Sequence, residues 1–92
     1  MILGLRHKAL RLLFEKGDRS RLPSQYVDKI GRILSRLEVA EDATDMDLPG
    51  FRLPPLTANL AGMWSVSVSR NTRIVFRFDS GNADEIDMID YH

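Results

Sequence analysis

Hydrophobic residues recur at helical spacing through the first forty residues of the chain. A first helix is predicted over residues 7–16, and Gly17 is placed to end it. A second helix is predicted over residues 24–40, with Ser24 as its N-terminal cap. The apolar stripes of the two helices comprise Leu10, Leu13 and Phe14, and then Val27, Ile30, Leu34 and Leu37. An acidic connector over residues 41–50 links these helices to the second half of the chain.

From residue 51 onward the hydrophobic period changes to two, which is typical of β-strands. Three main strands are predicted, over residues 63–69, 73–78 and 83–92, with turns at SRNT and DSGN. Residues 51–56 form a shorter extended piece, which two prolines limit. The apolar face carries Trp64, Val66, Val68, Ile74, Phe76 and Phe78, and the opposite face carries Ser65, Ser67, Ser69, Arg73, Val75 and Arg77.

This order of elements indicates an α+β fold, in which two N-terminal helices pack on one face of a small, mainly antiparallel sheet. Residues 1–5 are a candidate for an additional strand. A chain of 92 residues is expected to form one domain, spanning residues 1–92.

The composition excludes several kinds of chemistry. The chain has no cysteine, so disulfides, thiolate catalysis and cysteine-based zinc sites are excluded. No apolar run approaches the ~20 residues that a membrane span requires. A short apolar start followed at once by Arg6, His7 and Lys8 reverses the order found in signal peptides, so a cytoplasmic protein without membrane partners is expected.

The formal net charge is zero, but the charges are separated along the chain. Residues 1–36 contain nine lysines and arginines and three acidic residues, and residues 38–48 contain five acidic residues. Residues 49–77 contain four arginines and no acidic residue, and residues 78–92 contain five acidic residues. Arg32 and Arg36 stand four residues apart on one side of the second predicted helix. Such blocks favour a positive surface that could bind a phosphate backbone. Ordinary solvated helix faces are the alternative interpretation.

Arg73 and Arg77 point the same way from one predicted strand. If the helices cover the opposite face, both guanidinium groups lie on the open face beside Ser65 or Ser67, where they could clamp a phosphate. The alternative is a cross-strand ion pair with an aspartate of the last strand. The candidate partners for that pair are Asp87 and Asp90.

The chain ends in Asp90, Tyr91 and His92, three side chains that can move protons or hold them in place. An imidazole, with an ordinary pKa of ~6.5, suits acid–base chemistry near neutral pH. Asp90 could orient the imidazole and Tyr91 could stack on a base, and an exposed terminal histidine without a role is the alternative. The other histidine, His7, is interpreted as a structural or a surface residue, and two distant histidines predict no metal site and no cofactor.

Three segments carry a family resemblance: HKALRLLFEKG near the start, LPPLTANLAGMWSVSVSRNTRIVFRF in the middle and IDYH at the end. They resemble the HigB-type toxins, the "plasmid maintenance system killer" branch of the RelE/ParE superfamily. The most specific parts are the G-x-W-S and N-x-R-[IL]-x-F core together with the terminal D-Y-H.

The resemblance implies a RelE-like fold and a toxin that cleaves messenger RNA in the ribosomal A site, beside 16S rRNA. The ribose 2′-hydroxyl would attack the adjacent phosphorus without a metal, and a helix-turn-helix antitoxin of the HigA type would neutralise the toxin. By position, Arg73 would stabilise the phosphate and His92 would act as acid or base. Asp90 and Tyr91 would orient and contact the substrate. The expected RNA-binding residues are Arg32, Arg36, Arg70 and Arg77.

The chain also departs from the family pattern. Pro54 and Thr57 stand where well-studied members have a histidine and a lysine, and Ser69 replaces a common arginine. Arg70 could replace that arginine only if the turn begins there, because a shift of one residue reverses the face of a strand. Two other functions therefore stay open: a non-cleaving toxin on the same fold, as a ParE-like gyrase poison or an A-site blocker, and an adaptor-like RNA-binding domain.

Overall fold

A histidine begins the first helix and a glycine ends it. In the computed structural model, which describes residues 1–53 and 62–90, helix α1 spans Lys8–Lys16. Nδ1 of His7 accepts a hydrogen bond from the backbone N–H of Ala9 at 3.2 Å, so the structural role predicted for His7 is confirmed. Leu10 is fully buried, but Phe14 is 39% exposed, and its predicted place in the buried stripe is wrong because α1 buries only a narrow face.

Gly17 ends α1 in the left-handed conformation, with φ at 67°. We expect Gly17→Ala to lower the free energy of unfolding by about 1–2 kcal/mol, because an L side chain is strained there. Gly31 offers a matched control within α2 (Val27–Val39), since a Cβ at this position meets nothing within 4 Å. Gly31→Ala should instead stabilise the protein by about 0.5–1 kcal/mol. Urea unfolding measures the free energy of unfolding of both variants. Equal changes at Gly17 and Gly31 would contradict the special role of Gly17.

Helix α2 begins later than the sequence predicted. Its N-cap is Tyr26, which makes no capping bond through its side chain, so the capping role expected for Ser24 is wrong. The carbonyl of Pro23 accepts the backbone N–H groups of Tyr26 and Val27, both at 3.0 Å, and a turn therefore occupies the residues that precede the helix. The buried face of α2 also includes Ile33, which the predicted stripe omitted.

The acidic connector contains a short 3-10 helix, η1 (Ala43–Met46). Asp42 and Asp45 form a capping box at its start. The carboxylate of Asp42 accepts the backbone N–H of Thr44, and the carboxylate of Asp45 accepts the backbone N–H groups of Glu41 and Asp42. Met46 is fully buried, so this acidic segment is anchored in the core rather than acting as a plain link.

The sheet is antiparallel, with the order β1 (Trp64–Ser67), β2 (Thr72–Asp79) and β3 (Asn82–Asp90). The turn between β2 and β3 holds Ser80 and Gly81 at φ 52° and 81°, as a tight hairpin requires. The candidate strand at residues 1–5 makes two parallel bridges to β3, from Ile2 to Ala83 and from Leu5 to Ile86. Residues 51–53 form no strand, and residues 54–56 of the predicted extended piece lie outside the described residues.

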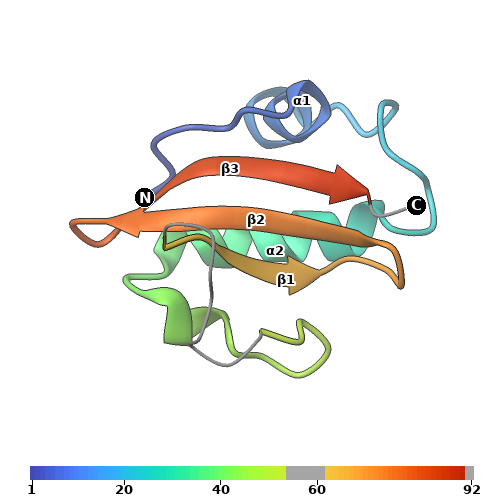
Figure 1. Cartoon of the computed structure of the whole chain (residues 1–92). Coiled ribbons are helices and arrows are strands. Elements are labelled where there is room, and N and C mark those ends of the chain that lie inside the picture. The colour runs from blue at the N-terminus through green and yellow to red at the C-terminus, as the bar shows by residue number, and fades with distance from the viewer. Residues whose placement is uncertain (54–61, 91–92) are drawn as a thin grey trace.

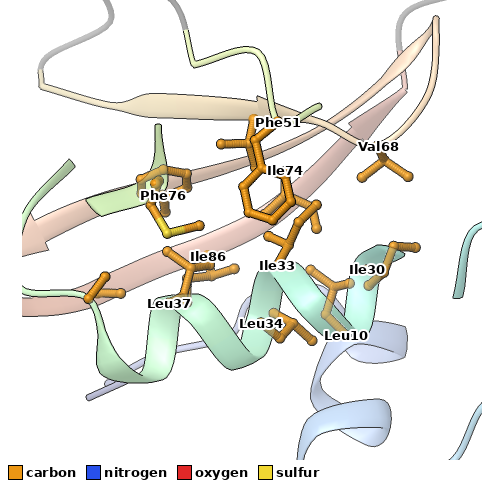
Figure 2. Close-up of a cluster of buried hydrophobic side chains, with 14 of the residues drawn as sticks. Leu10, Ile30, Ile33, Leu34, Leu37, Phe51, Val68, Ile74, Phe76 and Ile86 are labelled. Atoms are coloured by element: carbon orange, nitrogen blue, oxygen red, sulfur yellow. The ribbon is translucent and has the colours of Figure 1, made fainter. Parts of the chain in front are cut away.

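The helices and the inner face of the sheet enclose one hydrophobic cluster (Figures 1 and 2). Ile74 and Phe76 of β2 are fully buried in this cluster, which also contains Ile33 and Leu37 of α2, and the rings of Phe76 and Phe78 meet edge to face at 5.7 Å. The predicted α+β fold, with its helices on one sheet face, is therefore confirmed. Within residues 1–53 and 62–90, no helix is long and apolar enough to cross a membrane.

Candidate functional site

Arg73 lies on the open face of the sheet, which is the face opposite the helices. Successive side chains of a strand point to opposite faces, and the next residue along β2, Ile74, is buried in the core. Its guanidinium group is fixed by three hydrogen bonds. Nε donates to Oγ of Ser65 at 2.8 Å, while Nη2 donates to the carbonyl oxygens of Arg52 at 2.9 Å and Ser65 at 3.2 Å. Among the described residues, Nη1 donates to no protein acceptor, so this part of the guanidinium group keeps its hydrogen-bonding capacity for a ligand.

A cavity of about 420 Å³ adjoins this guanidinium group. Its lining residues are Arg52, Ser67, Ser69, Arg70 and Arg73. Strand β1 ends at Ser67, so Arg70 belongs to the connection before β2, and the turn geometry that its role required is present. Arg70 and Arg73 thus reach the same cavity, although they would point to opposite faces on one continuous strand.

Among residues 1–53 and 62–90, no carboxylate lines this arginine cavity, which is defined by the five residues above. The ion pairs found within the described part of the chain are Arg6–Glu85, Arg19–Asp28 and Arg77–Glu85, and none involves an arginine of the cavity. Three guanidinium groups that lack a counter-charge from the described residues repel one another and attract an anion. The arrangement can therefore hold a phosphate group through charge-assisted hydrogen bonds.

Lys29 of α2 extends this positive field. Its ammonium group donates to the carbonyl oxygen of Gly50 at 2.8 Å. Burial has the largest effect and lowers the pKa of Lys29. Three guanidinium groups lower the pKa of Lys29 further, those of Arg32, Arg52 and Arg73. An anion bound in the arginine cavity would oppose this repulsion and raise the pKa of Lys29.

Asp90 does not share the arginine cavity. The register pairs Arg73 with Ile89 and Thr72 with Asp90, so alternation places Asp90 on the helix side of the sheet. There it lines a second cavity of about 410 Å³, together with Tyr26 and Thr72, and Ser69 borders both cavities. Asp90, a candidate cross-strand partner of Arg73 and Arg77, therefore lies on the opposite face from both arginines. Tyr91 and His92 lie outside the described residues, and the roles expected of them stay predictions.

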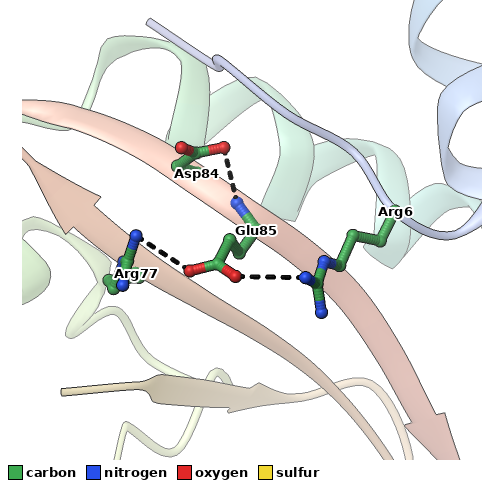
Figure 3. Close-up of polar contacts among 4 residues, drawn as sticks. All are labelled: Arg6, Arg77, Asp84 and Glu85. Atoms are coloured by element: carbon green, nitrogen blue, oxygen red, sulfur yellow. Dashed lines mark hydrogen bonds and ion pairs between the residues drawn. The ribbon is translucent and has the colours of Figure 1, made fainter. Parts of the chain in front are cut away.

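Arg77 shares the face of Arg73 but is paired. Its Nη2 lies 2.9 Å from one carboxylate oxygen of Glu85, whose other oxygen lies 3.2 Å from Nη2 of Arg6 (Figure 3). A register shift in β3 opposite Arg77 brings Glu85 to this position, so neither of the predicted aspartate partners is used. The ion pair leaves Arg77 less available for RNA than Arg73.

Arg32 and Arg36 of α2 line a different groove, of about 640 Å³, whose floor includes Val27, Leu48 and Phe51. Nε of Arg36 donates to the carbonyl oxygen of Asp45 at 2.9 Å, whereas Arg32 is exposed. The predicted side-by-side placement of the two arginines is confirmed. Their binding of RNA stays a prediction.

Sequence reasoning did not select Arg52 or Lys29 as site residues. The signal for Arg52 was present, because residues 49–77 contain four arginines and no acid. Lys29 carries no such signal, since only the packing of α2 against the segment around Gly50 brings its ammonium group near the cavity.

Two helices on a small antiparallel sheet, with arginines on the open face that form no ion pair within the described residues, define a small α+β protein with a candidate anion-binding site. A family model described as "RelE-like toxin of type II toxin-antitoxin system HigB" matches residues 3–92. The chain belongs to this family of HigB-like toxins, which confirms the resemblance seen in the sequence, and a type II toxin has an antitoxin as its partner.

Two relatives agree with this assignment. The chain is 39% identical over 92 residues to "Endoribonuclease HigB" of Proteus vulgaris, covering the full length of both proteins. It is 33% identical over 85 residues to "Toxin HigB-1" of Vibrio cholerae serotype O1, covering 90% of each chain.

Proposed function

We propose that the protein is a ribosome-dependent endoribonuclease that cleaves messenger RNA and so stops translation. The observation that carries this proposal is the arginine cavity, in which Arg73 is fixed by three hydrogen bonds and no carboxylate of the described residues competes for its charge. Membership of the HigB-like toxins and the similarity to a protein named as an endoribonuclease support the same activity.

The proposed reaction needs no group beyond the protein and the RNA. The ribose 2′-oxygen loses its proton to a base and attacks the adjacent phosphorus, and the bond from phosphorus to the 5′-oxygen breaks as that oxygen gains a proton. Nη1 of Arg73 would stabilise the negative charge that grows on the phosphate oxygens. His92 would serve as the acid or the base.

The remaining residues have supporting roles in this proposal. Tyr91 would contact the substrate, and Asp90 would orient its neighbours from the helix-side cavity where the register places it. The cytoplasm would be the site of action, because the target is a translating ribosome with its 16S rRNA exposed in the A site. The antitoxin would be a helix-turn-helix protein of the HigA type.

Induced expression in a bacterial host tests the function. We expect growth arrest and new 5′-hydroxyl ends within translated messages, mapped by sequencing, and no such ends when translation initiation is blocked. Arrest with intact messages would instead support an A-site blocker, and a DNA-damage response would support a gyrase poison. Normal growth would favour an RNA-binding adaptor, and each of these three results would overturn the nuclease.

A further inference from the structure

The segment that carries Arg52 is pinned to the sheet from both sides. Phe51 is 5% exposed in the core, and its carbonyl oxygen accepts the backbone N–H of Ser67 at 2.6 Å. The carbonyl oxygen of Arg52 accepts Nη2 of Arg73 at 2.9 Å. Arg52 is thus held at a fixed distance from the guanidinium group of Arg73, although no regular element contains it.

The backbone of Arg52 is strained. Its φ is 52°, in the left-handed region that residues with a side chain rarely adopt. Such conformations persist where the surrounding contacts enforce them, and they gather at functional sites. Here the enforced conformation places an exposed arginine at the arginine cavity, where glycine or asparagine would fit the backbone with less strain.

The charge of Arg52 is uncompensated. Within the part of the chain that the structure describes, Arg52 forms no ion pair, and its neighbours in the cavity, Arg70 and Arg73, form none either. The charge of Arg52 therefore meets repulsion from two neighbouring arginines and no attraction from a carboxylate of the described residues. An anionic ligand would account for both features, because it would turn this repulsion into attraction.

We propose that Arg52 binds an RNA phosphate jointly with Arg73, as a second guanidinium group of the cleavage site. This inference rests on the proposed function and names a residue that the arguments from sequence and family did not select. Arg73 would contribute its Nη1 group, and Arg52, which lines the same cavity, would donate to the same phosphate. The hydrogen bond from Nη2 of Arg73 to the backbone carbonyl oxygen of Arg52 ties the two residues of this clamp together.

Cleavage of a message on programmed ribosomes, measured under single-turnover conditions, tests the clamp. Arg52→Gly and Arg52→Asn remove the charge but keep the carbonyl group and suit the left-handed backbone. We expect both to lose about 10–100-fold in rate, the worth of a charge-assisted hydrogen bond. Arg52→Lys should recover most of that loss, and Arg21→Ala, at an exposed arginine outside the cavity, should change nothing.

A second measurement does not depend on cleavage. Titration with inorganic phosphate, followed by the NMR signal of the Lys29 ammonium group, should show weaker binding in Arg52→Gly than in the wild type. Without phosphate, the same variant should raise the pKa of Lys29, because one of the charges that repel its proton is gone. Thermal unfolding should show both variants at least as stable as the wild type.

The outcomes separate the clamp from the nuclease. If the wild type cleaves messages and both Arg52→Gly and Arg52→Asn cleave them at the same rate, the clamp is overturned and the proposed function stays intact. If the wild type does not cleave messages, but both variants bind phosphate more weakly than the wild type does, the nuclease is overturned and the phosphate site is retained. Phosphate binding that is equal in all variants would overturn the role of Arg52 whatever the cleavage result.

Discussion

Arg73→Ala is expected to lower the rate of message cleavage by about 10²–10³-fold and to relieve growth arrest, because a preorganised donor to the reacting phosphate is lost. The reason is geometric as much as electrostatic. Three hydrogen bonds to Ser65 and Arg52 hold the guanidinium plane before substrate arrives, so no ordering is needed during the reaction. Arg73→Lys should recover little, since an ammonium group cannot reproduce this planar set of bonds.

The control for Arg73 is Arg11→Ala, which removes an exposed arginine of α1 whose Nη1 bonds only the carbonyl oxygen of Leu5 at 3.3 Å. This variant should cleave at the wild-type rate. The cleavage rate of Arg77→Ala should lie between those of Arg73→Ala and Arg11→Ala, because Glu85 already offsets the charge of Arg77. Cleavage by Arg73→Ala at the wild-type rate, in protein that unfolds at an unchanged temperature, would contradict the assigned site.

His92→Ala is expected to reduce cleavage by about 10²–10⁴-fold, the usual contribution of a general acid or base. The wild-type rate should also change with pH near the ordinary imidazole pKa of ~6.5, and the variant should lose that dependence. Messenger RNA cleavage on programmed ribosomes between pH 5.5 and 8.5 measures both effects.

The second histidine of the chain provides the matched control. His7 accepts the Ala9 N–H as the cap of α1, and asparagine is an equally good cap, so His7→Asn should keep both the fold and the pH profile. A pH profile that persists in His92→Ala but disappears in His7→Asn would show that the wrong histidine was assigned. Growth arrest that survives His92→Ala with messages intact would support a non-cleaving toxin.

The elements of the fold were largely predictable because each one follows a local periodicity. The alternation of Ile74 and Phe76 with Arg73 fixed which face of β2 enters the core before any contact was known. The errors fell at element ends, where a backbone interaction decides. The carbonyl of Pro23 begins the turn before α2, so Ser24 never becomes a cap.

The candidate site was predictable in part. Arg73 was selected from its strand position, and Arg70 was selected on a condition that the turn satisfies. The face of Asp90 was not predictable, because it depends on a register that contains a shift between Val75 and Arg77. Glu85 became the partner of Arg77 for the same reason, and no periodic rule foretells such an irregularity.

By itself, the sequence determined the two helices, the strands, the open face with its arginines and the family to which the chain belongs, because periodicity and motifs are properties of neighbouring residues. Only the tertiary structure decided which charged side chains form ion pairs. Whether an arginine forms an ion pair, like Arg77, or lies beside another arginine with no ion pair in the described part of the chain, like Arg52, depends on groups far apart in the sequence. Electrostatic attraction follows distance in space, and packing alone sets that distance.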